Sequence, residues 1–137
     1  KLLEIVKIPE TSDITYNIAL EFGKKLGKSC VTCKDTPGFI VNRLLVPYMA
    51  EAVRMLERED ASAKDIDIAM KLGASYPMGP FELSDYVGLD TTKSIIDIWH
   101  KIYPNNPIFN PIPMLDKMVA EGKYGIKSGE GFYKYKK

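Results

Sequence analysis

This chain of 137 residues contains two cysteines and one histidine, residue types that can ligate zinc or supply a nucleophile and a base. Cys30 and Cys33 form a lone C-x-x-C motif, and a zinc site would need two more ligands at matching spacing. A spacing of three residues in a strand points two thiols to opposite faces, so we expect buried strand cysteines and no redox pair. His100 lies far from both, and without a carboxylate or nucleophile partner it is expected to be a partly exposed helix residue.

The segment Gly23–Ser29 has some features of a phosphate-binding loop. It carries three residues between its glycines where the motif needs four, and it would follow a helix and precede a strand, the reverse of the required order. A glycine helix stop is therefore the better interpretation. No Gly-x-Gly-x-x-Gly occurs in the chain, so the dinucleotide fingerprint is absent from this sequence.

Asn42 is the most informative polar residue. At 100° per residue it shares a helix face with an apolar stripe, whose members are Leu45, Val46, Met49, Val53 and Leu56. Burying an amide without partners costs about 1–3 kcal/mol, so Asn42 must meet either a structural hydrogen-bond partner or a ligand. The residues alone leave both readings open. Pro47, in the same helix, frees the carbonyl of Arg43 and predicts a kink.

Two further segments have a structural and a functional interpretation. Tyr76–Glu82 is typical of a tight connection that begins a helix at Pro80, although Met78 and Phe81 could also form the wall of an apolar substrate pocket. The tail, 122–137, is rich in lysine and glycine. Its lysines, Lys127 among them, are ordinarily solvated, but ammonium groups beside flexible backbone would also suit a phosphate-bearing ligand.

The composition limits the class of protein that must position these residues. The formal charge is +1, which provides no field that would attract nucleic acid or an anionic membrane. With 45% hydrophobic and 27% charged residues the chain is expected to be globular. No apolar run is long enough to span a membrane, and the first residues, which lack an initiator Met and a signal-peptide layout, suggest a piece of something longer.

The first 34 residues predict strand, helix and strand. The strand runs from Leu2 to Ile8, Thr11 or Ser12 caps the helix, and Ser29–Cys33 forms the second strand. Apolar residues at four-residue steps then stack on one helix face; they are Ile14, Ile18, Phe22 and Leu26. Such a crossover joins parallel strands, so this segment is expected to close a larger α/β sheet.

Residues 35–137 predict helices instead. Thr36 is a cap candidate for a helix with apolar residues from Phe39 to Leu56. Ser62, with Asp65 three residues on, has the spacing of a capping box for a second helix. Three more are expected at 79–88, from a cap at Asp90, and at 113–121. The fold class is therefore mainly α, preceded by a β-α-β segment.

Several separated motifs, taken in order, resemble the C-terminal part of the 3-hydroxyacyl-CoA dehydrogenases, most closely the animal mitochondrial short-chain form. They are 35–43 (DTPGFIVNR), 67–73, 76–83 (YPMGPFEL), 88–90 (GLD) and 127–133 (KSGEGFY). The resemblance covers essentially the whole chain. It implies that residues 1–34 end an NAD-binding Rossmann domain and that residues 35–137 form a helical substrate and dimerisation domain, similar to the C-terminal domain of 6-phosphogluconate dehydrogenase.

The resemblance also implies a reaction, NAD-linked oxidation of an L-3-hydroxyacyl-CoA to a 3-ketoacyl-CoA in β-oxidation, and a location in the mitochondrial matrix. In this likeness Asn42 matches the asparagine that hydrogen-bonds near the reacting 3-oxygen, and Lys127 matches the lysine that contacts NAD. The catalytic His-Glu pair belongs to the N-terminal domain of the family. We therefore expect that this chain lacks the pair, since His100 does not match its motif, and that it is inactive alone.

Two alternatives remain open from the sequence. One is a non-enzymatic helical dimerisation module, for which the apolar content of Phe39–Leu56 is sufficient. The other is a structural protein similar to lens λ-crystallin, which resembles the same family. The resemblance implies an acyl-CoA substrate and NAD. The residues themselves lead us to expect a homodimer formed by the helical part, with no metal, no nucleic acid and no membrane span.

Overall fold

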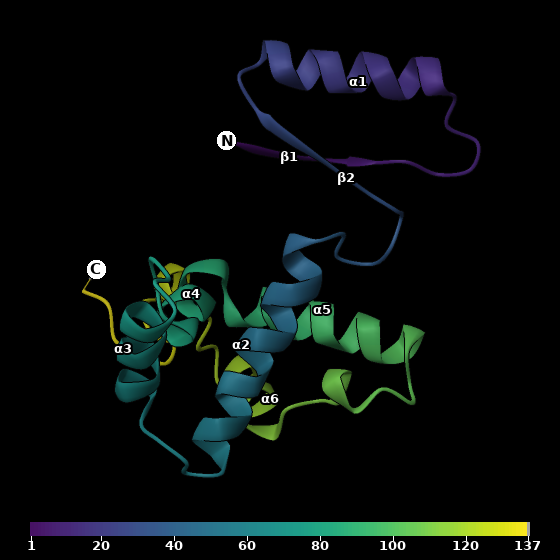
Figure 1. Cartoon of the computed structure of the whole chain (residues 1–137). Helices are drawn as coiled ribbons and strands as arrows, with labels where there is room; N and C mark the ends of the chain where they lie inside the picture. The colour runs from purple at the N-terminus through teal and green to yellow at the C-terminus, as the bar shows by residue number, and fades with distance from the viewer. Residues whose placement is uncertain (137) are drawn as a thin grey trace. The chain divides into compact units, whose positions relative to one another are not determined.

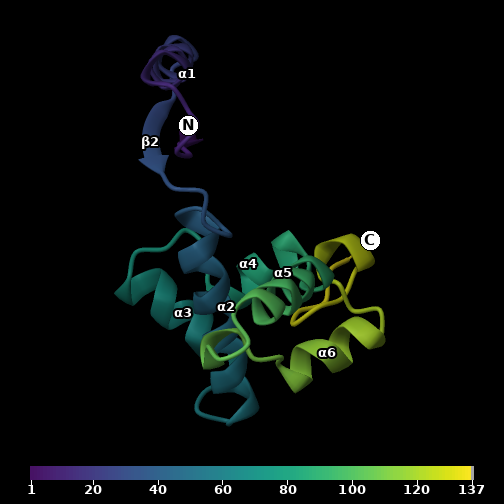
Figure 2. The ribbon, with the colours of Figure 1, turned by 90° about the vertical axis from the view of Figure 1, so that its right-hand side faces the viewer.

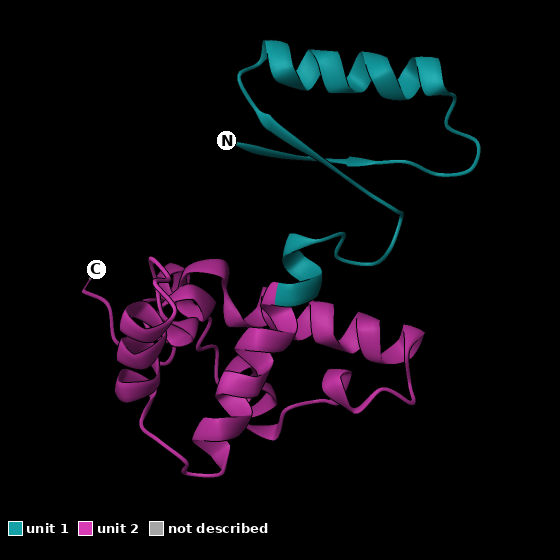
Figure 3. Cartoon of the chain, viewed as in Figure 1, with its two compact units in different colours: residues 1–44 teal, residues 45–137 magenta. Residues whose placement is uncertain are grey.

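The computed structural model describes residues 1–136, and within them the chain is mainly helical (Figure 1). In chain order the elements are β1 Leu2–Val6, α1 Asp13–Lys25, β2 Ser29–Cys33, α2 Val41–Glu57, α3 Ala63–Gly73, α4 Pro80–Val87, α5 Leu89–Ile102, the 3-10 helix η1 Pro107–Phe109, α6 Pro113–Ala120 and the 3-10 helix η2 Ile126–Ser128. The chain divides into two compact units, residues 1–44 and residues from Leu45 onward (Figure 3). The predicted fold class is confirmed.

The first unit contains the predicted β-α-β segment. Strands β1 and β2 are parallel neighbours, with Leu2 opposite Ser29 and Val6 opposite Cys33. The first strand ends at Val6, two residues before the predicted end. Helix α1 joins the strands and begins after Ser12, whose side chain accepts a hydrogen bond from the backbone N–H of Thr15.

The apolar stripe predicted on α1 does not pack against these strands. Its four residues are exposed to solvent: Ile14 by 74%, Ile18 by 62%, Phe22 by 61% and Leu26 by 55%. The face that meets the sheet carries Gly23, which lies against Leu3 and the Cys30 thiol. Tyr16 lies on the same side, where its hydroxyl contacts the Thr32 hydroxyl at 2.5 Å. A β-carbon at position 23 would overlap both neighbours, so this contact requires glycine.

Helix α2 begins at Val41, later than a cap at Thr36 would allow, so that prediction was wrong. Gly38 and Phe39 have φ of 87° and 49°, which is left-handed backbone that a right-handed helix excludes. The helix start is held instead by Glu4 of β1, whose Oε1 accepts hydrogen bonds from Ile40 N at 2.8 Å and Val41 N at 3.0 Å. Glu4 and the two amides that it binds all lie in the first compact unit.

The second unit has one hydrophobic core, and α2 contributes five buried residues to it. Helix α2 continues past Pro47 to Glu57. Figure 2 shows α2 among helices α3 to α6. Fully buried side chains from four other segments complete the core; the largest are Phe81, Leu89, Ile96, Ile112 and Leu115. Aromatic rings pack edge to face within it, Phe81 on Phe132 with centroids 4.7 Å apart and Trp99 on Phe109 at 5.4 Å.

The starts of the later helices follow local sequence signals. Ser62 caps α3 by accepting from Asp65 N at 3.1 Å, as predicted. Asp90 does not cap α5, which begins at Leu89 after Gly88, because Gly88 with φ of 105° already turns the chain. Glu57 of α2 accepts from Met114 N at 2.6 Å in the first turn of α6. No helix within residues 1–136 is long and apolar enough to cross a membrane.

Candidate functional site

The C-terminal tail is held by a buried carboxylate. Asp85 of α4, only 1% exposed, accepts hydrogen bonds from Phe132 N and Tyr133 N, both at 2.9 Å, and from the Tyr135 hydroxyl at 2.8 Å. Burial raises the pKa of the Asp85 carboxyl, and the three hydrogen bonds act in the opposite direction. Three donors converging on one buried acid fix the position of the tail on α4.

A second buried carboxylate joins α3, α4 and the tail. Asp67, 2% exposed, accepts from Phe81 N at 2.8 Å and Glu82 N at 3.2 Å in the first turn of α4, and from the Tyr133 hydroxyl at 2.6 Å. Burial, and then the hydrogen bond to Asp67, raise the pKa of Tyr133 well above its usual range. We refer to Asp67, Asp85, Tyr133 and Tyr135 as the tail clasp.

The tail glycines serve this clasp. A β-carbon at position 131 would overlap Oδ1 of Asp85, and one at position 125 would overlap the Asp85 backbone. Gly125 also has φ of 97°, which disfavours other residues. The tail backbone therefore approaches Asp85 closely at both positions, and only glycine allows this.

Asn42 lies in the first turn of α2 and its side chain is exposed. Within residues 1–136 no hydrogen bond involves its amide, so the reading in which it is buried with a structural partner does not hold. The N–H groups that open α2 already bind Glu4, whose negative charge offsets the positive end of the helix dipole. The Asn42 amide is still available here, and it can donate two hydrogen bonds from its NH2 group and accept hydrogen bonds at its oxygen.

Lys127 lies in η2 and forms an ion pair with Asp90 of α5, with Nζ 2.6 Å from Oδ1. Glu130, three residues further along the tail, pairs with Lys123, at 3.5 Å. The hydrogen bond from Lys127 lowers the pKa of the Asp90 carboxyl. The Lys127 side chain is 49% exposed, so its remaining N–H groups can reach a ligand in solvent.

Met78 and Phe81 have different environments. Met78 lines a small apolar cavity of about 180 Å³, whose other lining residues are Leu45, Tyr76, Pro77 and Leu83. Phe81 has no exposed surface and packs in the core against Phe132, so it does not line this cavity. The structure therefore separates the two residues that the sequence grouped as a pocket wall.

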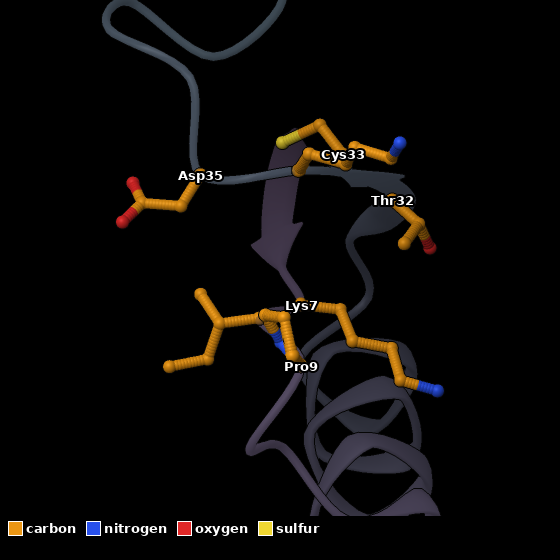
Figure 4. Close-up of a pocket in the computed structure, with 7 residues that line it drawn as sticks. Lys7, Pro9, Thr32, Cys33 and Asp35 are labelled. Carbon is orange, nitrogen blue, oxygen red and sulfur yellow. The ribbon is translucent and has the colours of Figure 1, made fainter.

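A larger hollow lies at the carboxyl ends of β1 and β2, the edge at which parallel sheets usually bind ligands (Figure 4). Its volume is about 620 Å³ and its lining includes Lys7, Pro9, Cys33 and Asp35. Lys7 is already paired with Asp13 at 2.7 Å. Burial, with smaller contributions from Glu4 and Asp35, raises the pKa of the Cys33 thiol, which therefore stays protonated. The hollow offers space but no activated nucleophile.

Both cysteines are free thiols. They are half-buried, whereas the sequence analysis predicted that they would be buried. The Cys30 thiol lies near the Leu20 carbonyl of α1, whereas Cys33 lines the hollow on the other face of the strand, as its spacing predicts. His100 is partly exposed on α5, also as predicted. No group of three His, Cys, Asp or Glu side chains within residues 1–136 could hold a metal ion.

Comparison with known proteins gives a consistent result. The family model of the 3-hydroxyacyl-CoA dehydrogenase C-terminal domain matches residues 38–135. The chain belongs to the 3-hydroxyacyl-CoA dehydrogenase family. It is 67% identical over 136 residues to the hydroxyacyl-coenzyme A dehydrogenase, mitochondrial, of Sus scrofa, and 65% identical to that of Homo sapiens. These alignments cover 99% of this chain and 43% of each relative, so the chain spans less than half of their length.

A solved structure of a relative has the same fold. The (S)-3-hydroxybutyryl-CoA dehydrogenase of Ralstonia eutropha matches with a TM-score of 0.94 at 39% identity, over 99% of this chain and 48% of that one. The likeness therefore includes both the β-α-β segment and the helical part of the dehydrogenase chain.

The sequence did not reveal the tail clasp or the role of Glu4. Asp67 and Asp85 lie on helices, where carboxylates are ordinarily solvated, and their tyrosine partners are 66 and 50 residues away. The one local signal is Phe132-Tyr133-x-Tyr135, three aromatic residues after two closely spaced glycines, which predicts a tail that packs on the core.

Proposed function

We propose that this chain is the substrate-positioning part of an NAD-dependent L-3-hydroxyacyl-CoA dehydrogenase. In the proposed reaction the C3–H bond of the substrate breaks with transfer of a hydride, the 3-hydroxyl gives its proton to a general base supplied by the rest of the enzyme, and a 3-ketoacyl-CoA forms. NAD, when bound, supplies the hydride acceptor. Membership in the dehydrogenase family is the observation that carries this proposal.

Asn42 is the residue of this chain that we assign to the reacting centre. Its exposed amide has no hydrogen bond within residues 1–136 and is carried on a helix whose start is fixed by Glu4. An amide N–H aimed at the 3-oxygen stabilises the negative charge that develops there as the hydroxyl proton leaves. The Asn42 amide is preorganised by its helix and has no hydrogen-bond partner in the described residues, which are the two properties that a donor to the 3-oxygen needs.

Lys127 is the residue that we assign to the cofactor. Asp90 directs its ammonium group, and the tail clasp holds the segment from which it extends. One half-exposed cation, already balanced by a carboxylate, fits a single contact to a phosphate-bearing cofactor and does not form a dinucleotide site by itself. The main NAD site would belong to the part of the enzyme that these residues do not include.

The exposed apolar surfaces fit a longer, dimeric enzyme. The α1 stripe of Ile14, Ile18 and Phe22 is positioned to pack against further secondary structure of a nucleotide-binding sheet. In the helical unit, Leu72 is 80% exposed and Ile98 is 54% exposed, and a second copy of the chain would cover such residues. The names of the relatives in Sus scrofa and Homo sapiens support a mitochondrial location, and we propose the matrix as the compartment.

These same exposed residues favour the second candidate, a dimerisation module with no ligand at Asn42. Substitution Asn42→Ala in the complete protein separates the two functions. If the protein is an enzyme, kcat/KM for acetoacetyl-CoA reduction should fall by roughly ten- to a thousandfold. Losing one hydrogen-bond donor to a developing oxyanion raises the activation free energy by about 2.7–4 kcal/mol, and by less if the amide only orients the substrate. The melting temperature should hardly change because the amide has no partner in the fold. Unchanged kinetics would exclude the assignment.

A further inference from the structure

The start of helix α5 lies against the ammonium group of Lys127. Nζ of Lys127 is 2.6 Å from Oδ1 of Asp90, the second residue of the helix. The same nitrogen is 5.8 Å from the ring centroid of Tyr124, which is within the range of a cation–π contact. The lysine side chain is 49% exposed and the aspartate side chain 39% exposed, so the pair is also open to a ligand.

Gly88 leaves the room that this ion pair needs. A β-carbon at position 88 would lie 2.8 Å from Nζ of Lys127 and 2.9 Å from Oδ1 of Asp90, so one of the two groups would have to move. The φ of Gly88 is 105°, a backbone conformation that disfavours every residue with a β-carbon. Glycine therefore serves both the turn into α5 and the close approach of the lysine to the aspartate.

Hydrogen bonds hold the backbone of the loop that carries Lys127. The Ser128 hydroxyl accepts from Tyr124 N at 2.8 Å and lies 2.8 Å from the Glu130 carbonyl, to which it can donate. Leu89 N, at the start of α5, donates to the Tyr124 carbonyl at 3.1 Å. The loop and the helix are therefore joined through their backbones as well as through the ion pair.

These backbone contacts leave the Lys127 side chain free to rotate, and Asp90 is what restricts it. Lysine carries its ammonium group on a flexible four-carbon stem, so a ligand that binds a free lysine must first order that stem. The hydrogen bond from Lys127, and then one from the backbone N–H of Thr91, lower the pKa of the Asp90 carboxyl, which is therefore ionised at neutral pH. The carboxylate can thus hold one of the three N–H groups of the ammonium and leave the others for a ligand.

We propose that Asp90 is a positioning residue for the cofactor and that it raises the affinity for NAD only through Lys127. This inference rests on the proposed function, in which Lys127 contacts NAD. Without the lysine, the negative charge of Asp90 would repel the phosphates of the cofactor and would weaken its binding. The benefit of Asp90 is therefore the fixed position that it gives to the ammonium group, and Gly88 allows that position.

The test measures the dissociation constant of NADH for the complete enzyme, by the fluorescence of the bound nucleotide, together with kcat. Asp90→Asn removes the charge with little change in size and should raise the dissociation constant about two- to tenfold, with kcat within about twofold of wild type. Lys127→Ala should raise the constant at least as much. In the double variant the constant should equal that of Lys127→Ala or fall below it, because the repulsion of the cofactor is then also removed.

Asp97→Asn is the matched control. Asp97 lies in the same helix, is 38% exposed and pairs with Lys93 at 2.7 Å, so its substitution also breaks a half-exposed ion pair of α5. The dissociation constant of NADH should hardly change in this variant. Melting temperatures show whether each variant is folded, and Asp90→Ser replaces Asp90→Asn if the amide prevents folding.

A dissociation constant that rises in Asp90→Asn only while Lys127 is present supports the proposal. No rise with Lys127 present, tighter binding, or a rise by the same factor with and without Lys127 overturns it and leaves the contact of Lys127 with NAD intact. An unchanged constant in Lys127→Ala would exclude that contact, and with it this inference. A wild-type enzyme that binds no NADH would exclude the dehydrogenase function itself.

Discussion

Replacing Asp85 with alanine should release the C-terminal tail. The substitution removes the acceptor for two backbone N–H groups and one tyrosine hydroxyl, all at 2.8–2.9 Å and in a side chain that is 1% exposed. A hydrogen bond to a charged group contributes about 1.5–3 kcal/mol, so three rigid losses would exceed about 4.5 kcal/mol. The tail can instead detach and let water satisfy its amides, which limits the cost.

We therefore expect Asp85→Ala to lower the free energy of unfolding by about 2–4 kcal/mol. Denaturant titration gives this value, and hydrogen exchange at the Phe132 and Tyr133 amides locates the change. Asp116→Ala is the control, because that carboxylate is 42% exposed and pairs with Lys93 at 2.9 Å, which is worth about 0–1 kcal/mol. A loss below about 1 kcal/mol in Asp85→Ala, with both amides still protected, would refute the role given to the clasp.

The remaining predictions concern charged residues. Lys127→Ala in the complete enzyme should raise KM for NAD several-fold with little change in melting temperature, since the ion pair of Lys127 with Asp90 is half exposed. The control is Lys123→Ala, because Lys123 is also a tail lysine and pairs with Glu121. An equal KM for NAD in the two variants would contradict the assignment of Lys127 to the cofactor. The hydrogen bonds from Lys71 and Gly79 lower the pKa of Glu82 below its ordinary 4.5. That contribution to stability is present above pH 4.5 and disappears as the pH falls through the lowered pKa, so Glu82→Gln should be less stable than wild type at neutral pH and should approach it in acid. A stability gap that stays constant with pH would contradict this explanation, and Glu10→Gln at an exposed site should show no gap.

Local signals predicted the elements well where neighbours in sequence determine them. Ser62 with Asp65 marks the start of α3, and the run of Ser29–Cys33 marks β2, because capping and β propensity act over a few residues. The start of α2 was misplaced because it depends on Glu4, which lies 36 residues away. Long-range contacts of this kind leave no periodic pattern in the sequence.

The candidate site was predictable in part for the same reason. Helical periodicity identified Asn42 as an unusual amide, but its exposure in the folded chain could not be read from an apolar stripe whose next member, Leu45, lies almost one turn later. The sequence showed that the tail is rich in glycine, and only the folded chain shows that Gly125 and Gly131 lie against Asp85. Similarly, Phe81 and Met78 are close in sequence, yet one is core and the other lines a cavity.

The central claim, that these residues position the substrate for a reaction completed by the rest of the enzyme, is tested most directly by comparing two proteins in one assay. Acetoacetyl-CoA reduction is followed by the loss of NADH, with the complete enzyme and with residues 1–137 alone. The account predicts turnover by the complete enzyme and none by residues 1–137, which carry neither the dinucleotide fingerprint nor any histidine except His100. Turnover by residues 1–137 within tenfold of the complete enzyme, or none by the complete enzyme, would contradict it.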